Sequence, residues 1–372
     1  MHKLKYLLLA AGLLCAAGLV ISGCAFAATG FSFQDIANGP RVEEREHTAK
    51  IEGLTGIDVR SENIRVKVVP TAGKDIVVHY LEGDQLTCSI TEQNGVLVVE
   101  STYLQNWFDQ FRFGLFSSLA LLEYDITVEL PKDYTQALKV QNGNAGISVE
   151  DASLTDLDCE TSNSSVELTG VTAGTLRAVS SNGHISLQKV SSAGAMQVRN
   201  SNSSIKMEDV RAEDTTIEDS NSSIKLIEFA GTGKLHVQNS NGSIYFEDIE
   251  VGKTTVKNSN SRVEFDGAQL GLLSISNYNG RIQLKDVTAQ ESVKASTTNS
   301  SVVVEALAGP DLTLRTENGG VRGTIAGKKG EYNILAQTAN GSSNLEDQLS
   351  DSKNKLQVVT SNGGIDITFT QP

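Results

Sequence analysis

The feature that most constrains the fold is an internal repeat of about twenty residues. Residues 198–210 read Val-Arg-Asn-Ser-Asn-Ser-Ser-Ile-Lys-Met-Glu-Asp-Val, and residues 237–249 read Val-Gln-Asn-Ser-Asn-Gly-Ser-Ile-Tyr-Phe-Glu-Asp-Ile. Each copy centres on an asparagine, and successive asparagines are 19 to 22 residues apart. The twelve are Asn144, Asn163, Asn182, Asn202, Asn221, Asn241, Asn260, Asn279, Asn299, Asn318, Asn340 and Asn362. This period, without a helical pattern, indicates a solenoid.

Apolar residues recur at fixed distances from each asparagine. The third residue after it is Ile or Val in eleven of the twelve copies, as at Ile205, Ile224 and Ile244, and only Ser343 in the Asn340 copy breaks this column. The fifth residue after it is also mostly apolar, and the residue between is usually polar. Such alternation predicts a strand with one buried face.

A second strand is predicted before each asparagine, where the sixth and fourth preceding residues are apolar. The eighth residue after the asparagine adds a short third contact. One copy alone cannot bury these side chains, but stacked copies turn each column into a continuous apolar rib. The residues therefore predict that like strands lie on one another along a rod.

The predicted fold is an all-β, right-handed parallel β-solenoid (β-helix), since chirality favours that hand. About 12 regular rungs cover residues 138–372, and at a strand spacing of about 4.8 Å they make a rod roughly 50 Å long. Irregular N-terminal rungs are expected over residues 51–137, where Asn63 and Asn94 have apolar neighbours at the same offsets.

The asparagine row has a structural interpretation. A bend between strands needs a residue that tolerates left-handed backbone angles, which favours Asn or Gly, and Gly follows the asparagine in six copies. Stacked asparagines can also bond to one another along the rod, as amide ladders do. The alternative interpretation is a ligand-binding row.

Residues 1–28 are predicted to be a membrane anchor or lipoprotein signal. The 23 residues from Tyr6 to Ala28 carry no charge, which is long enough to span a bilayer as a helix. Lys3 and Lys5 precede this segment, and positive charges next to a membrane segment favour the cytoplasmic side. The N-terminus is therefore predicted to lie in the cytoplasm and the rest of the chain outside the cell.

The alternative is a cleaved signal. Ile21-Ser22-Gly23-Cys24 resembles a bacterial lipobox, in which Cys24 is lipidated and becomes the mature N-terminus. Both interpretations place the solenoid on the extracytoplasmic side of the cell envelope. Residues 29–50, which contain Gly39-Pro40 and a charged run, then form a predicted stalk.

An aromatic loop over residues 101–122 interrupts the irregular rungs. It contains Trp107, Phe108, Phe111 and Phe113. An open solenoid end exposes apolar core and unpaired backbone, so one interpretation is a cap over the first rungs. The other is a partner- or membrane-contacting patch, because exposed aromatic clusters mark such sites.

Charge and motifs exclude several classes of function. The net charge is −14, which argues against nucleic-acid binding. No nucleophile elbow, phosphate loop or zinc-binding helix motif occurs, and the histidines lack the spacing of metal ligands.

Cys88 and Cys159 fall in apolar columns and are expected to be buried small side chains rather than a disulfide or metal pair. No catalytic, cofactor-binding or metal-binding residue is therefore predicted.

Two sets of charged residues can be interpreted either as solvent-exposed surface residues or as ligand-binding residues. An acidic column lies seven residues after the asparagine. It forms either a solvated bend or a row of calcium ligands. The nonapeptide calcium-binding motif is absent. Its members are Asp151, Asp209, Glu228, Asp248 and Asp286. Two outward pairs of cations, Lys206 with Lys225 and Arg262 with Arg281, are either solvated or in contact with an anionic polymer.

The recurring unit Ser-Asn-Gly/Ser-x-Ile-x-Leu-x-Asp-Val resembles a family of bacterial surface proteins described as putative adhesins with β-strand repeats, a domain of unknown function. Residues 126–131, residues 138–140 and the Gly-Phe-Ser-Phe at 30–33 carry the same resemblance. It covers roughly residues 51–369. The resemblance implies a right-handed β-helix outside the cell membrane and, for some relatives, a link to envelope stress. It implies no catalytic residues.

We therefore expect a non-enzymatic extracytoplasmic surface protein, a β-solenoid binding or scaffolding module of an adhesin or of an envelope-stress system. The expected partners are the membrane, through the N-terminal segment, and a cell-envelope polymer or surface protein; no nucleic acid and no cofactor is expected. The alternative is a β-helix enzyme, a lyase or hydrolase acting on a polysaccharide, which needs acids clustered with Lys or Arg in one groove. A third option is a polymerising filament. The predicted membrane anchor and the predicted cap over the first rungs argue against it.

Overall fold

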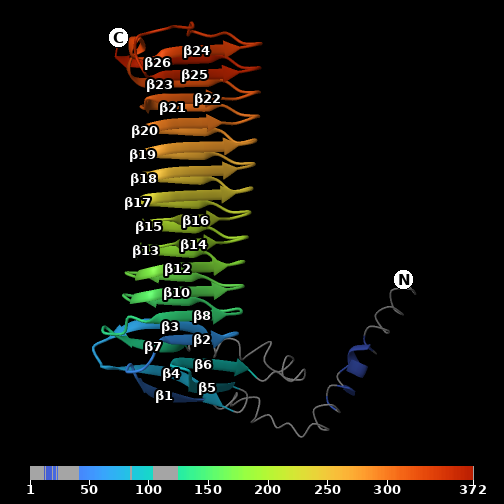
Figure 1. The fold of residues 1–372 in the computed structure, drawn as a ribbon. Coiled ribbons are helices and arrows are strands. Elements are labelled where there is room, and N and C mark those ends of the chain that lie inside the picture. The colour runs from blue at the N-terminus through green and yellow to red at the C-terminus, as the bar shows by residue number, and fades with distance from the viewer. Residues whose placement is uncertain are drawn as a thin grey trace, which may run out of the picture.

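The computed structural model describes residues 42–83, 86–103 and 125–371, together with helical positions at 12, 14–18, 20, 21 and 23. The described strands form one connected 26-stranded sheet wound into an elongated rod (Figure 1). From residue 42 onward the described helical structure is limited to the short 3-10 segment η1, Lys329–Glu331. The predicted all-β solenoid is confirmed.

The strands are β1 Val42–Lys50, β2 Gly56–Ser61, β3 Arg65–Thr71, β4 Asp75–Gly83, β5 Leu86–Gln93, β6 Val96–Tyr103, β7 Asp125–Pro131, β8 Ala137–Asn142, β9 Ile147–Glu150, β10 Ser153–Thr161, β11 Val166–Thr169, β12 Thr172–Ser180, β13 Ile185–Ser192, β14 Met196–Arg199, β15 Ile205–Ala212, β16 Thr215–Glu218, β17 Ile224–Asn239, β18 Ile244–Asn258, β19 Val263–Asn277, β20 Ile282–Ser296, β21 Val302–Leu307, β22 Asp311–Arg315, β23 Val321–Lys328, β24 Asn333–Thr338, β25 Lys355–Thr360 and β26 Ile365–Gln371.

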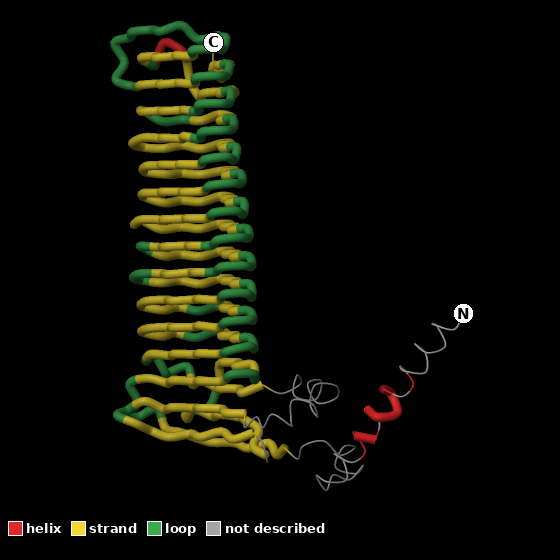
Figure 2. The backbone as a smooth tube through the Cα atoms, turned by 90° about the vertical axis from the view of Figure 1, so that its right-hand side faces the viewer, coloured by secondary structure: helices red, strands yellow, loops and turns green. Residues whose placement is uncertain are grey.

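Each regular rung adds one strand to each of two layers. The strand that precedes the asparagine belongs to the first layer, where β10, β12, β14 and β16 stack in parallel. The strand that follows the asparagine belongs to the second layer, where β11, β13 and β15 stack in parallel. Strands β17 to β20 each run from the second layer of one rung into the first layer of the next. Figure 2 shows the loops of successive rungs aligned along one edge.

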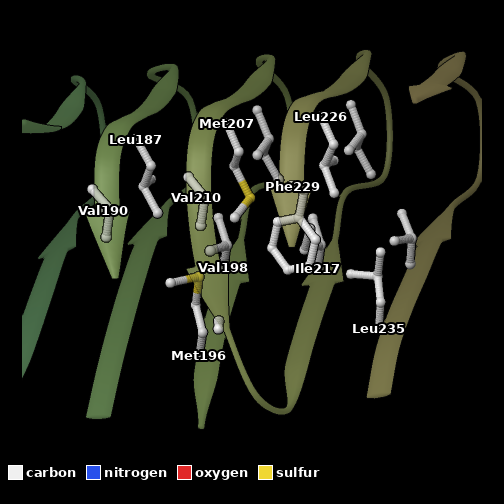
Figure 3. Close-up of a cluster of buried hydrophobic side chains, with 14 of the residues drawn as sticks. Leu187, Val190, Met196, Val198, Met207, Val210, Ile217, Leu226, Phe229 and Leu235 are labelled. Carbon is white, nitrogen blue, oxygen red and sulfur yellow. The ribbon is translucent and has the colours of Figure 1, made fainter. Parts of the chain in front are cut away.

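The core lies between the two layers, and the register aligns equivalent residues. Ile205, Ile224 and Ile244 are Cα partners in successive strands, and each is fully buried. In Figure 3, Met207 of the second layer and Met196 of the first layer both point into the space between the layers. The columns predicted from the sequence are therefore the apolar ribs of the rod.

The left-handed bends do not lie at the predicted residues. None of the twelve row asparagines has a positive φ. In the first nine copies the residue seven positions later has it instead, with φ between 46° and 54° at the non-glycine members. These are Asp151, Lys189, Asp209, Glu228, Asp248, Asp286 and Ala306, and Gly170 and Gly267 occupy the same column. The interpretation of the asparagine as the left-handed residue is wrong.

The physical reason lies in the spacing of the apolar columns. The inward residues five and eight positions after the asparagine are three apart, whereas alternation along a strand requires an even number. One extra residue must be absorbed, and a left-handed residue does this as in a β-bulge. Asp tolerates this backbone conformation better than most residues.

The N-terminal end is not stacked in sequence order. β2 and β3 pair in parallel with β8 and β9 of the regular rod, while β6 and β7 form the next rung outward. Three antiparallel pairings then cover the edges of this end. β4 pairs with β7, β1 pairs with β4, and β5 pairs with β6. Within the described residues, the first strand begins at Val42, inside the predicted stalk.

Asn94 does not centre a rung. β5 and β6 are antiparallel, with Gln93 paired to Val96, and Asn94 and Gly95 between them have φ of 53° and 79°. An Asn-Gly pair favours the two-residue hairpin turn, which needs positive φ at both positions. The expectation of another solenoid copy at Asn94 is therefore wrong.

The C-terminal end is also out of order. β25 pairs with β22 on one side and with β24 on the other, and β26 pairs with β23. The Asn362 copy therefore lies inside, and the earlier Asn340 copy is outermost. The rung formed by the final strands β25 and β26 is thus inserted between the Asn318 and Asn340 copies. The Asn340 copy has Ser343 at an inward position, so a rung with the apolar Ile365 covers the core better.

Little of the predicted anchor falls within the described residues. Its described positions, between 12 and 23, are helical, and Leu14, Val20 and Ile21 are exposed. Among the described residues, no helix combines the length and the apolar character needed to cross a bilayer. A retained helix or a lipidated Cys24 stays a prediction, and Cys24 lies outside the described residues.

Candidate functional site

The asparagine row is an unbroken ladder of side-chain hydrogen bonds. Each Nδ2–H donates to the Oδ1 of the asparagine in the adjacent rung, at 2.7 to 2.9 Å. Asn63 accepts from Asn144 and extends the row by one member beyond the predicted twelve. In Asn182, Asn221 and Asn241 the amide also donates to a backbone carbonyl of the preceding rung. The amides are thus engaged mainly with one another along one edge of the rod.

A second polar column, missed from the sequence, lies two residues before the ladder and is buried except for the half-buried Thr338. Its side chains donate to a backbone carbonyl of the adjacent rung at 2.6 to 3.1 Å. Its members are Asn142, Thr161, Ser180, Asn200, Asp219, Asn239, Asn258, Asn277, Thr297, Thr316, Thr338 and Thr360. In Asn239, Oδ1 also accepts the backbone N–H of Asn241 and Gly242. This column closes the turn, which explains why the ladder residues need no left-handed backbone.

Asp219 is the exception in this column. It is buried, and its carboxylate accepts backbone N–H groups of Ser220, Asn221 and Ser222. An ionised carboxylate has no proton to donate to the adjacent rung. Burial raises the pKa of Asp219 above its ordinary value, although the three N–H groups act in the opposite direction.

The acidic column consists of bend residues at the corner of the second layer. Asp209, Asp248 and Asp286 all have a φ of 51°. Nowhere in residues 42–83, 86–103 or 125–371 do three or more His, Cys, Asp or Glu side chains gather in an arrangement that could hold a metal ion. The backbone conformation is therefore sufficient to explain this column.

The predicted outward cations of the second layer are mostly paired with acids. Lys206 and Lys225 are Cα partners, with Lys206 Nζ 2.7 Å from Glu208 and Lys225 Nζ 3.6 Å from Glu247. Lys225 also lies over the Tyr245 ring, with Nζ 5.0 Å from the centroid. Arg262 lies 3.5 Å from Glu264 in the same layer. The second-layer face thus carries mixed, largely compensated charge.

The cysteines of the solenoid have no nucleophilic character. Cys159 is fully buried and Cys88 is half-buried, and both are free thiols. Burial raises the pKa of Cys88 to about 12 and that of Cys159 still further. The reactive form is the thiolate, so neither thiol is activated at neutral pH.

Two hollows lie near the ends of the rod. The larger, about 770 Å³, is at the C-terminal end beside β24 and includes Ile334, Leu349 and Leu356 in its lining. The smaller, about 360 Å³, is at the N-terminal end and is lined by polar residues. Among these are Arg60, Glu62, Glu100 and Glu160.

The predicted aromatic contact residues cannot be placed in either hollow. Trp107, Phe108, Phe111 and Phe113 lie outside the described residues, between the end of β6 at Tyr103 and the start of β7 at Asp125. Both interpretations of this segment, cap and contact patch, stay predictions.

Comparisons with known proteins give a family and two structural likenesses. The family described as Toastrack DUF4097 matches residues 54–244. No curated protein matches the chain. A solved structure described as a putative cell adhesion protein from Clostridium sporogenes ATCC 15579 is 9% identical, with a TM-score of 0.24, and the match covers 89% of this chain and 100% of that chain. Another, described as a putative adhesin from Parabacteroides merdae ATCC 43184, is 10% identical, with a TM-score of 0.21, covering 88% of this chain and 96% of that chain.

Proposed function

The chain belongs to the Toastrack DUF4097 family, and from this we propose that it is a non-enzymatic binding or scaffolding module with an adhesin-like role at the cell surface. The observation that carries the proposal is the continuous register of the two layers. Equivalent outward positions recur at every strand spacing of about 4.8 Å, so both faces offer regularly spaced contact points along the rod. Such extended surfaces suit long or repetitive partners.

We place the solenoid on the extracytoplasmic side of the envelope, wound with a right hand. The uncharged segment from Tyr6 to Ala28 behind Lys3 and Lys5 supports an outward-facing anchor, either as a retained helix or through a lipidated Cys24. Twisted parallel strands favour the right-handed connection. Adhesion and envelope-stress sensing are both compatible with such a surface.

A binding array with enzymatic readout tests the proposal. The purified full-length protein is applied to immobilised glycans, teichoic acids and envelope peptides, and the supernatants are assayed for reducing and unsaturated sugar ends. Saturable binding without product supports a binding module. Release of product from any glycan contradicts it.

The rival function is a polysaccharide lyase or hydrolase, and the N-terminal hollow is where it would be located. Glu62, Glu100 and Glu160 with Arg60 supply acids and a cation in one groove. If a glycan is degraded, the substitution Glu100→Gln tests this site. Loss of turnover in Glu100→Gln, with unchanged thermal stability, would establish the enzyme.

A further inference from the structure

We propose that one face of the C-terminal half binds a linear anionic glycopolymer, whose charges are carboxylates or phosphodiesters. The site is the outward side of the first layer on β18, β19, β20 and β22, the yellow to orange strands of Figure 1. Lys253, Lys257, Lys294 and Arg315 define it, and we call it the cationic face. The inference rests on the proposed binding function and names the class of ligand.

The strand register places these cations in an ordered array. Lys257, Ser276, Ser296 and Arg315 are successive Cα partners in one outward column. Lys257 and Arg315 are therefore three strand spacings apart, or about 14 Å. Lys253 precedes Lys257 by four residues in β18, or about 13 Å along the strand.

The neighbouring outward column supplies the remaining cation between these two. Its successive Cα partners are Thr255, Ser274, Lys294 and Thr313. Lys294 thus lies one strand before Arg315 and two strands after Lys257. A polymer that runs along the rod would meet positive charge at its start, middle and end on this face.

The four cations are exposed, and within the described part of the chain none of them has a salt-bridge partner. Closer to the N-terminus the same layer is different: Arg177 lies 2.7 Å from Asp158, and Arg199 lies 2.7 Å from Glu218. Uncompensated cations in a chain of net charge −14 leave a local positive potential that attracts anions.

Several acids of the same rungs lie on the second layer. Glu247, Glu264 and Asp266 lie there, and the last two are engaged by Arg262 and Lys285. On the first layer, residues 253–257, 272–276, 294–296 and 313–315 contain no Asp or Glu. The carboxylates at its margins are Asp311, whose Cα partner is Lys355, and the exposed Glu291 and Glu317.

Small hydroxyl side chains fill the space between the cations. They are Thr255, Ser274, Ser276, Ser296 and Thr313, all at least partly exposed. Short side chains let a polymer approach the sheet closely, and each hydroxyl can donate to or accept from a sugar hydroxyl or an anionic oxygen. Lysine and arginine add charge-assisted hydrogen bonds to carboxylate or phosphate. This combination favours a charged, hydroxyl-rich polymer over a neutral one.

A matched pair of triple variants tests the proposal in the full-length protein. The first combines Lys257→Gln, Lys294→Gln and Arg315→Gln. The second, as control, combines Lys206→Gln, Lys225→Gln and Arg262→Gln on the second layer, which removes the same formal charge. Binding to polygalacturonate, to poly(glycerol phosphate), to neutral dextran and to duplex DNA is measured at several salt concentrations.

We expect at least one of the two anionic glycopolymers to bind, with an affinity that falls as salt rises, because exposed charges are screened. The first variant should lose about tenfold in affinity and the control less than about twofold. Preference between polygalacturonate and poly(glycerol phosphate) identifies carboxylate or phosphodiester as the ligand group. Five of the six substituted side chains are exposed and Lys225 is half-buried, so both variants should keep the thermal unfolding midpoint of the wild type. Lys294→Glu provides a single-site check.

Three results would overturn the proposal. Equal losses in the two triple variants would show an effect of overall charge, and duplex DNA binding as tightly as the glycopolymers would show a general polyanion surface. Binding of dextran or an envelope peptide that is unchanged in the first variant, with no binding of the anionic glycopolymers, would refute the cationic face. That last result would leave the proposed binding function intact.

Discussion

Asn340 donates its Nδ2–H to Oδ1 of Asn362 at 2.8 Å, although Asn362 follows it by 22 residues and lies one rung closer to the middle of the rod. Asn362 in turn donates to Asn318 at 2.8 Å. The ladder is therefore continuous in space but not in sequence. The later copy closes the regular core, and the earlier copy caps it.

The inserted strand β25 should be more important for the C-terminal end than the outermost strand β24. Val358→Asp places a charge at a fully buried position of β25, whereas Leu335→Asp changes a side chain of β24 that is 37% exposed. We expect Val358→Asp to detach β24 and β25, expose the edge of β22 and promote association, because unpaired edges template further pairing. Light scattering should show larger particles for Val358→Asp alone. Larger particles for both variants would contradict the assigned order.

Replacement of Asp219 by Asn should stabilise the protein. The eleven other members of the buried polar column donate to a carbonyl of the adjacent rung, and the equivalent acceptor for residue 219 is the carbonyl of Ser203. Asp219→Asn supplies this donor and removes a buried charge, which should add about 1 kcal/mol to the free energy of unfolding. Denaturant titration measures the change. Asp248→Asn, at an exposed bend, should change it by less than about 0.5 kcal/mol.

The gain from Asp219→Asn should depend on pH. Burial raises the pKa of Asp219 in the folded chain above the ordinary value of 3.8. The wild-type residue therefore favours folding most when it is protonated in both states, below 3.8, and this contribution is lost as the pH rises through the folded pKa. The difference between variant and wild type should be small at low pH and reach a plateau above the folded pKa. An equal difference at all pH values would show that charge has no part in it.

The asparagine ladder should be more sensitive in its middle than at its end. Asn260→Ala removes the hydrogen bond that Asn260 donates to Asn241 and the one that it accepts from Asn279. Asn340→Ala removes only the hydrogen bond to Asn362. Because the row is exposed, each bond should contribute about 0.5 kcal/mol, so the loss in unfolding free energy should be roughly twice as large for Asn260→Ala. Equal losses would argue against an additive ladder.

The acidic column should respond to backbone conformation and not to calcium. Asp209 has a φ of 51°, so Asp209→Gly should be tolerated, whereas Asp209→Val should destabilise by about 2 kcal/mol because a β-branched residue is strained there. Thermal unfolding with and without calcium separates the two interpretations of the column. A midpoint that rises with calcium in the wild type and not in Asp209→Gly would restore the metal row.

The regular part of the rod could be predicted from the sequence because the period alone determines which residues stack. Ile205, Ile224 and Ile244 occupy the same offset, and burial against like neighbours is the only arrangement that removes them all from water. The buried polar column was within reach, since Asn200 and Asn239 each stand two residues before a ladder asparagine. The left-handed bend was also within reach, through the three-residue step between apolar columns.

The order of rungs at the two ends could not be predicted in this way. All copies share nearly the same offsets, so the sequence does not state which copy stacks on Asn318. That choice depends on small differences in burial, such as Ser343 in one copy against Ile365 in another. The cationic face was missed for a related reason. Lys257 and Arg315 are 58 residues apart, and they form one surface only when the first-layer register is known.

At the C-terminal end, the order of the last two rungs in the rod is the reverse of their order in the sequence, so the fold cannot be completed in the order in which the chain is synthesised. A ribosome makes the Asn340 copy before the Asn362 copy, yet the earlier copy has its proper neighbour only after the later one has been made. Winding can follow translation up to the Asn318 copy and must then pause, with one segment held aside. A polypeptide truncated after residue 350 would lack β25 and β26, leaving its tip open and recognisable to proteases.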